Sequence, residues 1–161
     1  MAWSLPLRYL SDLGMVATAA LLERPVAWES GAVSVARASE RIAVYGTLRR
    51  GGGAQAALGL AGALEYRGRC RLRGVLIDLG AYPGLVAGEG TVAGELYDVA
   101  DLAVLRLLDR FEHYDPADPA GSAFVRRLSR LLDPPVDAWV WYYNRPVAGL
   151  PRLASGDWLA R

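Results

Sequence analysis

Residues 42–53 read IAVYGTLRRGGG, and the expected fold is built outward from this stretch. Its first four residues form a short β-type run that stops at Gly46, and the glycine triplet that follows predicts a loop. Such a turn would present successive N–H groups from Gly46, Thr47 and Leu48, which can bind an anion or a developing oxyanion. An ordinary tight turn accounts for the same residues without a ligand, so both interpretations stay open here.

Strand and helix patterns continue along the chain to its end. Further β-type runs lie at residues 69–78, 91–99, 124–131 and 138–143. A short helix is expected within residues 54–64, a longer one at 101–113, and a turn at 82–84. The mostly hairpin-like spacing indicates an α+β domain over residues 41–161, with a small mixed β-barrel of about five to six strands and flanking helices.

The first 40 residues are expected to form a separate N-terminal extension. Ser11 is a suitable N-cap and Pro25 a suitable stop, so a short helix over residues 12–23 is the favoured interpretation. The apolar run at 13–22 also has the outline of a secretory signal, although charged residues flank it on both sides. An over-long start assignment is a third explanation, and the sequence does not separate it from the helix.

The composition excludes several classes of function. With 18 basic and 17 acidic residues the net charge is +1, so neither nucleic acid nor an anionic membrane surface is an expected partner. All basic residues are arginine, which removes Schiff-base chemistry and the phosphate-binding lysine of nucleotide loops. One cysteine and one histidine are too few for an internal disulfide or a Cys/His zinc site, so we expect no metal site. The unpaired thiol and the lack of a convincing export signal favour a cytoplasmic location, and the oligomeric state stays open.

The predicted helix at residues 101–113 carries the most informative acidic residue. At 100° per residue, one broad apolar face gathers Val104, Leu105, Leu107, Leu108 and Phe111. Glu112 lies angularly between Leu105 and Leu108, on this apolar side. A carboxyl group there is partly desolvated, which raises its pKa and suits it to proton transfer near neutral pH. A Glu112 that merely ends the helix and reaches water fits the same pattern.

Other potentially reactive side chains have simpler explanations. His113 follows at the helix end, where a cation interacts favourably with the helix dipole, and no G-x-S-x-G motif supplies a nucleophile for it. Cys70 lies between two arginines, which could lower its pKa, yet its position also fits a core or edge residue. A hydrolase that uses Cys70 and His113 is therefore a weak alternative. Tyr143 alternates with two tryptophans on one face of the last predicted strand, as in an ordinary core strand.

Four short motifs occur in a fixed order after residue 41. They are VYGTLRRG at 44–51, LGxYPGL at 79–85, VxGELY at 92–97 and LDxFE at 108–112. In this order they resemble the γ-glutamyl cyclotransferase-like family, including its γ-glutamylamine cyclotransferase members. The tail at 143–159 is similar to that of the small bacterial members, and residues 1–40 are left unmatched.

The resemblance implies a cofactor-free reaction. In that family the α-amine of a small γ-glutamyl amine or γ-glutamyl amino acid attacks its own γ-carbonyl, which releases 5-oxoproline. By the same resemblance Glu112 would act as the general base. The glutamyl group would be bound by Tyr45, Gly46, Thr47 and Leu48. This chemistry is physically reasonable, because an α-amine is mostly protonated at neutral pH, and ring closure within one bound molecule gains a large effective concentration.

Three further residues bear on the pocket that the resemblance implies. Tyr82 and Tyr143 are candidates for its walls. Many family members carry Tyr where Phe124 stands, and the lost hydroxyl could alter substrate orientation or the accepted leaving group. The alternative to an enzyme is a non-catalytic domain of the same fold that binds a γ-glutamyl compound or another small anion, because fold alone does not determine function.

Overall fold

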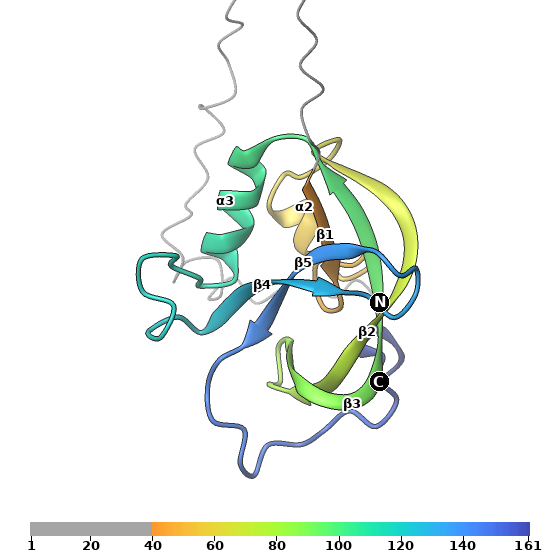
Figure 1. Cartoon of the computed structure of the whole chain (residues 1–161), viewed down its shortest axis with the longest axis vertical. Coiled ribbons are helices and arrows are strands. Elements are labelled where there is room, and N and C mark those ends of the chain that lie inside the picture. Colours follow the sequence, from red (N-terminus) through yellow and green to blue (C-terminus); the bar gives the residue numbers. More distant parts are fainter. Residues whose placement is uncertain (1–39) are drawn as a thin grey trace, which may run out of the picture.

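A mixed five-stranded sheet forms the body of the computed structural model, which describes residues 40–161 (Figure 1). The strands are β1 Glu40–Val44, β2 Leu64–Asp78, β3 Pro83–Val99, β4 Phe124–Arg130 and β5 Asp137–Tyr143. The helices are α2 Ala54–Ala57, α3 Leu102–Phe111 and the 3-10 turn η1 Trp158–Ala160. The helix expected at 12–23 lies outside the described residues.

The strand order is β2-β3-β1-β5-β4, which places β1 at the centre of the sheet. β1 pairs antiparallel with β3 and parallel with β5. Ile42 and Val44 belong to the core that α3 shares, whereas Ala43 and Tyr45 belong to a second core formed without α3. Burial on both faces explains why this strand is a continuous apolar run in the sequence. The loop after Val44 therefore starts from a firmly held point.

The expected closure of the sheet into a barrel is wrong, because β2 and β4 remain the two edges of an open sheet. The segment after β4 meets β2 only at a single bridge between Arg71 and Asp133. Asp133 is followed by Pro134 and Pro135. Proline has no N–H group to donate, so a ladder along the β2 edge cannot continue through this segment. The α+β class itself is confirmed.

α3 packs one face against the sheet, as its periodicity predicts. The Asp101 carboxylate caps its N-terminus by accepting an N–H of the first turn at 2.8 Å. Leu105, Leu108 and Phe111 are buried in the core shared with β1 and β5. The helix ends at Phe111 rather than at 113, because His113 has a left-handed backbone with φ 51°. No helix within residues 40–161 has the length and apolar character of a membrane span.

Two local features differ in extent from the sequence expectation. The short helix within residues 54–64 is a single turn, because Gly59 and Gly62 take positive φ angles that an α-helix does not contain. The turn expected at 82–84 is displaced toward the N-terminus. Pro83 already pairs with Asp78 in the β2–β3 hairpin, so the turn occupies the preceding residues.

Candidate active site

The loop that leaves the end of β1, residues 45–48, is held by backbone hydrogen bonds, and we refer to it as the cradle loop. Arg49 N–H donates to the Gly46 carbonyl at 3.0 Å, and the first N–H of α2 donates to the Thr47 carbonyl at 3.1 Å. A peptide unit is planar and trans, so a bond to its carbonyl directs its N–H the opposite way. The Thr47 and Leu48 N–H groups are therefore fixed in direction. Neither donates to an acceptor within residues 40–161.

Two glycines permit this shape. A Cβ atom at Gly52 would lie 2.3 Å from the Thr47 carbonyl oxygen, and one at Gly46 would lie 2.8 Å from Cγ of Pro83. Both distances are well below van der Waals contact, so any larger residue would displace the cradle loop or its neighbour. The close approach of backbone to backbone at Gly52 explains part of the glycine triplet seen in the sequence.

A cavity opens beside the cradle loop. The residues that line it come from four separate parts of the chain: Ala43, Val44, Tyr45, Gly46, Thr47, Leu48, Tyr82, Pro83, Phe111, Glu112 and Trp141. The candidate residues named from the sequence thus meet in one place, with the exception of Tyr143. The other lining residues were not site candidates: Ala43, Val44, Pro83, Phe111 and Trp141. Each lies in or beside one of the four motifs or the aromatic run of the last strand.

Glu112 follows the last residue of α3, and its side chain lines this cavity. Its N–H donates to the Leu108 carbonyl at 2.9 Å, which continues the helical hydrogen bonding to this residue. Burial raises the pKa of the Glu112 carboxyl from its ordinary 4.5 to about 8, and the nearby Asp109 carboxylate is the second cause. A carboxyl group with this pKa exchanges a proton readily near neutral pH.

Asp109 is buried in the last turn of α3 and connects this helix to two strands. Its Oδ1 accepts the Trp141 indole N–H at 3.0 Å, and its Oδ2 lies 3.0 Å from a guanidinium nitrogen of Arg126. Burial raises the pKa of Asp109, while the Arg126 charge and the Trp141 hydrogen bond oppose that change. These contacts hold the last turn of α3, and therefore Glu112, in a defined position relative to β4 and β5.

Three aromatic rings stand in a row beside the cavity. The ring centroids of Tyr82 and Phe124 are 6.1 Å apart, and those of Phe124 and Tyr143 are 5.3 Å apart. Tyr143 therefore lies one ring away from the cavity wall formed by Tyr82. Burial raises the pKa of Tyr82, with Tyr143 and Glu112 as the second and third causes, which indicates that Glu112 faces this side of the cavity. The Tyr45 hydroxyl is committed to the core, where it donates to the Trp141 carbonyl at 2.6 Å.

Comparisons with known proteins agree on one family. The family model described as "Gamma-glutamyl cyclotransferase, AIG2-like" matches residues 42–160. The chain belongs to this family. The γ-glutamylcyclotransferase family protein YtfP of Escherichia coli strain K12 is 43% identical over 86 residues, which span 53% of this chain and 68% of that protein. A protein of Vibrio cholerae named as a putative γ-glutamylcyclotransferase is 35% identical over 121 residues, which span 73% of this chain and 94% of that protein.

A solved structure of the same γ-glutamyl cyclotransferase family shares the fold. The solution NMR structure of YtfP from Escherichia coli superimposes with a TM-score of 0.57 at 38% identity, over 74% of this chain and 96% of that one. The resemblance drawn from the four sequence motifs is therefore confirmed at the level of the family. Homologues named as γ-glutamylcyclotransferases also support an enzyme of this type.

The hydrolase alternative requires Cys70 and His113 to lie in one site, and the structure places them apart. Cys70 is buried in the core formed without α3, and His113 lines a different cavity beyond the end of that helix. Burial raises the pKa of the Cys70 thiol to about 12, and the opposing effect of Arg49 is smaller. The interpretation of Cys70 as a core residue is confirmed by its 4% exposure. Within residues 40–161 no group of three or more His, Cys, Asp or Glu side chains is arranged to hold a metal ion.

Proposed function

We propose that the domain catalyses the cofactor-free cyclisation of a small γ-glutamyl amine or γ-glutamyl amino acid, releasing 5-oxoproline. The observation that carries the proposal is the shared cavity of Glu112 and the cradle loop. A carboxyl of raised pKa and two backbone N–H groups that have no acceptor within residues 40–161 are the two elements that such a reaction requires. Membership of the γ-glutamyl cyclotransferase, AIG2-like family supports the same reaction class.

The proposed reaction balances without any second reactant. The α-amine nitrogen of the substrate bonds to its own γ-carbonyl carbon, and the bond from that carbon to the leaving amine breaks. Starting from the protonated α-amine, the attacking nitrogen loses two protons in total, one before it attacks and one after the new bond forms. Glu112 accepts each in turn and passes it to the departing nitrogen, which leaves as an ammonium group, so the protein ends in its starting state. Holding both ends of one molecule in the cavity replaces an encounter between two molecules, which lowers the entropic part of the barrier.

The raised pKa of Glu112 suits the proton that it would move. The α-amine of a peptide has a pKa of about 8, and that of a γ-glutamyl compound is somewhat higher because its α-carboxylate stabilises the cation. Burial brings the pKa of the Glu112 carboxyl to about 8, much closer to this range than its ordinary 4.5. Proton transfer between groups of similar pKa is nearly balanced in free energy, whereas a carboxylate of pKa 4.5 would leave the proton on the amine. A cationic amine bound in the cavity also favours the ionised form of Glu112, because opposite charges stabilise each other.

The cradle loop has a matching electrostatic role in this proposal. Its Thr47 and Leu48 N–H groups would donate to the substrate oxygen that gains negative charge during ring closure. Removing one such donor typically costs about 3 kcal/mol of transition-state stabilisation. Because both donors are backbone groups held by other backbone bonds, they need little reorganisation when the charge develops.

The test is a direct assay of product on the full chain. A panel of γ-glutamyl amines and γ-glutamyl amino acids is incubated with the protein, and 5-oxoproline is measured by mass spectrometry. We expect Glu112→Gln to lower kcat about 100-fold or more, because general-base catalysis typically contributes that much. The matched control is Glu89→Gln, the same chemical change at a carboxylate that is 89% exposed and pairs with Arg73 on the β2–β3 hairpin.

Each outcome of this assay has a definite meaning. Product that forms equally well with Glu112→Gln would place the base elsewhere. Binding of a γ-glutamyl compound without any product would identify the domain as a non-catalytic binding module. Loss of activity in both glutamate variants would show that the assay reports a general disturbance rather than the role of Glu112.

A further inference from the structure

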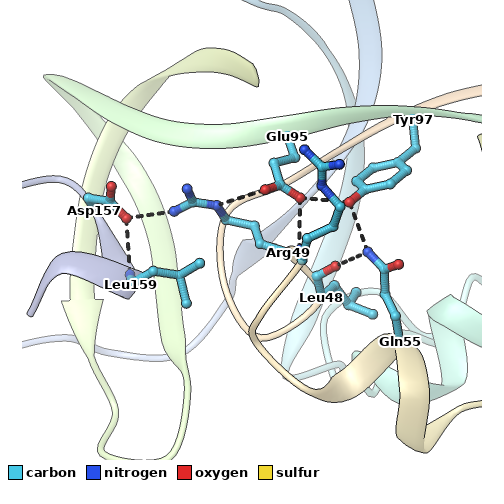
Figure 2. Close-up of polar contacts among 8 residues, drawn as sticks. Leu48, Arg49, Gln55, Glu95, Tyr97, Asp157 and Leu159 are labelled. Atoms are coloured by element: carbon cyan, nitrogen blue, oxygen red, sulfur yellow. Dashed lines mark hydrogen bonds and ion pairs between the residues drawn. The ribbon is translucent and has the colours of Figure 1, made fainter. Parts of the chain in front are cut away.

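A buried carboxylate lies directly behind the cradle loop. Glu95 lies on β3, where it pairs with Val44, the last residue of β1. It is 6% exposed and does not line the cavity that holds Glu112. Figure 2 shows its carboxylate bonded to Tyr97 and beside the Arg49 guanidinium, which in turn reaches Asp157 of the C-terminal segment. A carboxylate is costly to bury unless its hydrogen bonds are made.

Glu95 connects to the cradle loop by two routes. Its Oε2 accepts the Arg50 N–H at 2.8 Å, which holds the backbone just beyond the loop. The same oxygen accepts the Tyr97 hydroxyl at 2.6 Å. The Gln55 side-chain N–H group then donates to the Tyr97 oxygen at 3.0 Å and to the Leu48 carbonyl at 2.5 Å (Figure 2).

The second route has a fixed direction. The Gln55 amide nitrogen is a donor only, so the Tyr97 oxygen must accept from it and turn its own hydrogen toward Glu95. A carboxylate is an acceptor only and completes the chain. The pKa of Tyr97 is raised to about 12 by burial and then by this hydrogen bond, so its hydroxyl keeps its proton. We refer to the hydrogen bonds from Gln55 through Tyr97 to Glu95 as the relay. Its direction depends on Glu95, which is the final acceptor.

The relay holds the peptide unit between Leu48 and Arg49. The preceding peptide unit, between Thr47 and Leu48, carries the Leu48 N–H. The Leu48 carbonyl belongs to the peptide between Leu48 and Arg49, and that peptide is bonded at both its carbonyl and its N–H. The peptide that carries the Leu48 N–H joins Thr47 to Leu48, and both of these residues line the cavity. With its neighbour fixed on one side and the Thr47 carbonyl bonded on the other, this N–H has little freedom to turn.

Arg49 ties this cluster to the C-terminal segment. Its guanidinium lies 3.9 Å from Glu95 Oε1 and donates to Asp157 Oδ1 at 2.6 Å. Asp157 in turn accepts the Leu159 N–H at 3.0 Å and so caps η1. Burial alone would raise the pKa of Asp157, but the Arg49 and Leu159 hydrogen bonds lower it overall. The positive charge of Arg49 lies beside the buried Glu95 carboxylate and offsets part of the cost of burying it.

We propose that Glu95 is a positioning residue for the cyclisation, acting through Tyr97 and Gln55 to hold the cradle-loop amides toward the substrate. This inference rests on the proposed function, because it assigns those amides a role in the transition state. It adds a residue outside the cavity to the machinery of the reaction. It predicts that losing a hydroxyl group on β3 reduces catalysis without removing any group that touches the substrate.

The test compares Tyr97→Phe, Glu95→Ala and the double variant, with kcat and KM measured separately. We expect Tyr97→Phe to lower kcat about 10- to 100-fold with KM within about 3-fold, because a misdirected donor is missed mainly in the transition state. Glu95→Ala should lower kcat at least as much. The double variant should be no worse than Glu95→Ala, because residues of one network are non-additive. Glu95→Gln keeps an acceptor oxygen and should recover part of the loss.

The matched control is Tyr142→Phe, which removes a tyrosine hydroxyl bonded to Ser129 at 3.2 Å on the β4–β5 pair. It should leave kcat unchanged. Tyr97→Phe keeps its ring in the core, so the test stands even if Glu95→Ala does not fold. A kcat within about 3-fold of wild type for Tyr97→Phe, or additive losses in the double variant, would overturn the proposal.

A second readout separates this proposal from the proposed function. Amide hydrogen exchange at Arg49 and Ala54, whose N–H groups donate to the Gly46 and Thr47 carbonyls of the cradle loop, should become faster in Tyr97→Phe and remain unchanged in Tyr142→Phe, as ¹⁵N NMR would show. If the wild-type protein forms no 5-oxoproline, the proposed function fails, and the exchange rates still decide whether Glu95 and Tyr97 hold the loop. Unchanged exchange at both amides in Tyr97→Phe would refute the positioning role.

Discussion

The raised pKa of Glu112 makes a quantitative prediction about stability, which Glu112→Gln tests independently of catalysis. Burial and the Asp109 charge disfavour the ionised carboxylate in the folded state, where the pKa is about 8, while the unfolded chain has the ordinary value of 4.5. Between these two pH values the folded state holds a proton that the unfolded state has released. The stability that comes from this difference is fully present below pH 4.5 and is lost as the pH rises through 8.

The magnitude follows from the two pKa values. Each pKa unit is worth 1.36 kcal/mol, so the complete effect is about 5 kcal/mol. Glutamine mimics the neutral carboxyl group and does not titrate. Wild type and Glu112→Gln should therefore have similar stability near pH 4.5, and the variant should become progressively more stable than wild type up to about pH 8. The difference at pH 8 is a large fraction of the stability of an ordinary domain.

The assay is urea unfolding followed by circular dichroism, at a series of pH values from about 5 to 9. The free energy of unfolding of each protein is plotted against pH, and the difference between the two curves is the measured quantity. Glu89→Gln is the control, since its exposed carboxylate should leave the pH dependence of wild type unchanged. Parallel curves for wild type and Glu112→Gln would refute the reasoning, because they would mean that Glu112 titrates alike in the folded and unfolded states.

Three further predictions concern the same site. Asp109→Asn removes the like charge beside Glu112 and should shift the acidic limb of the kcat/KM pH profile to lower pH; an unshifted limb would show that Asp109 has no electrostatic role. Gly52→Ala places a Cβ atom against the Thr47 carbonyl. We expect it to destabilise the fold by about 1–3 kcal/mol in urea unfolding and to lower kcat more than 10-fold in the 5-oxoproline assay. Wild-type behaviour in both measurements would contradict the steric argument. Cys70→Ala should keep kcat within about 3-fold of wild type. The wild-type thiol should resist iodoacetamide at pH 8, because its pKa is about 12. Rapid alkylation of the folded protein would contradict the burial of this thiol.

Several elements could be predicted from the sequence because they depend on neighbours along the chain. The apolar face of α3 and its Asp101 cap follow from helical periodicity and from local hydrogen bonding. The turn after β1 follows from its glycines. The order of four short motifs was enough to indicate the family, which the match over residues 42–160 confirms.

Other features depend on contacts between distant segments, and the sequence could not supply them. Closure of the sheet was predicted and is wrong, because it required a continuous ladder between β2 and β4 that the prolines after β4 interrupt. The sequence left open whether the arginines beside Cys70 lower its pKa, and only the packing shows that burial raises it. The sequence analysis gave Glu95 no role of its own, because two of its partners, Arg49 and Arg50, lie about 45 residues earlier in the chain.

Sequence alone therefore determined the family, the helix that carries Glu112 and the glycine turn that forms the cradle loop. Tertiary structure alone decided that these two elements face one cavity, how strongly Glu112 is desolvated there, and which groups hold the cradle loop from behind. The physical reason is that hydrogen bonds within a turn or helix are set by adjacent residues, whereas desolvation and ion pairing depend on every segment that packs around a group. A pKa of about 8 at Glu112 is a property of that packing, and no window of the sequence contains it.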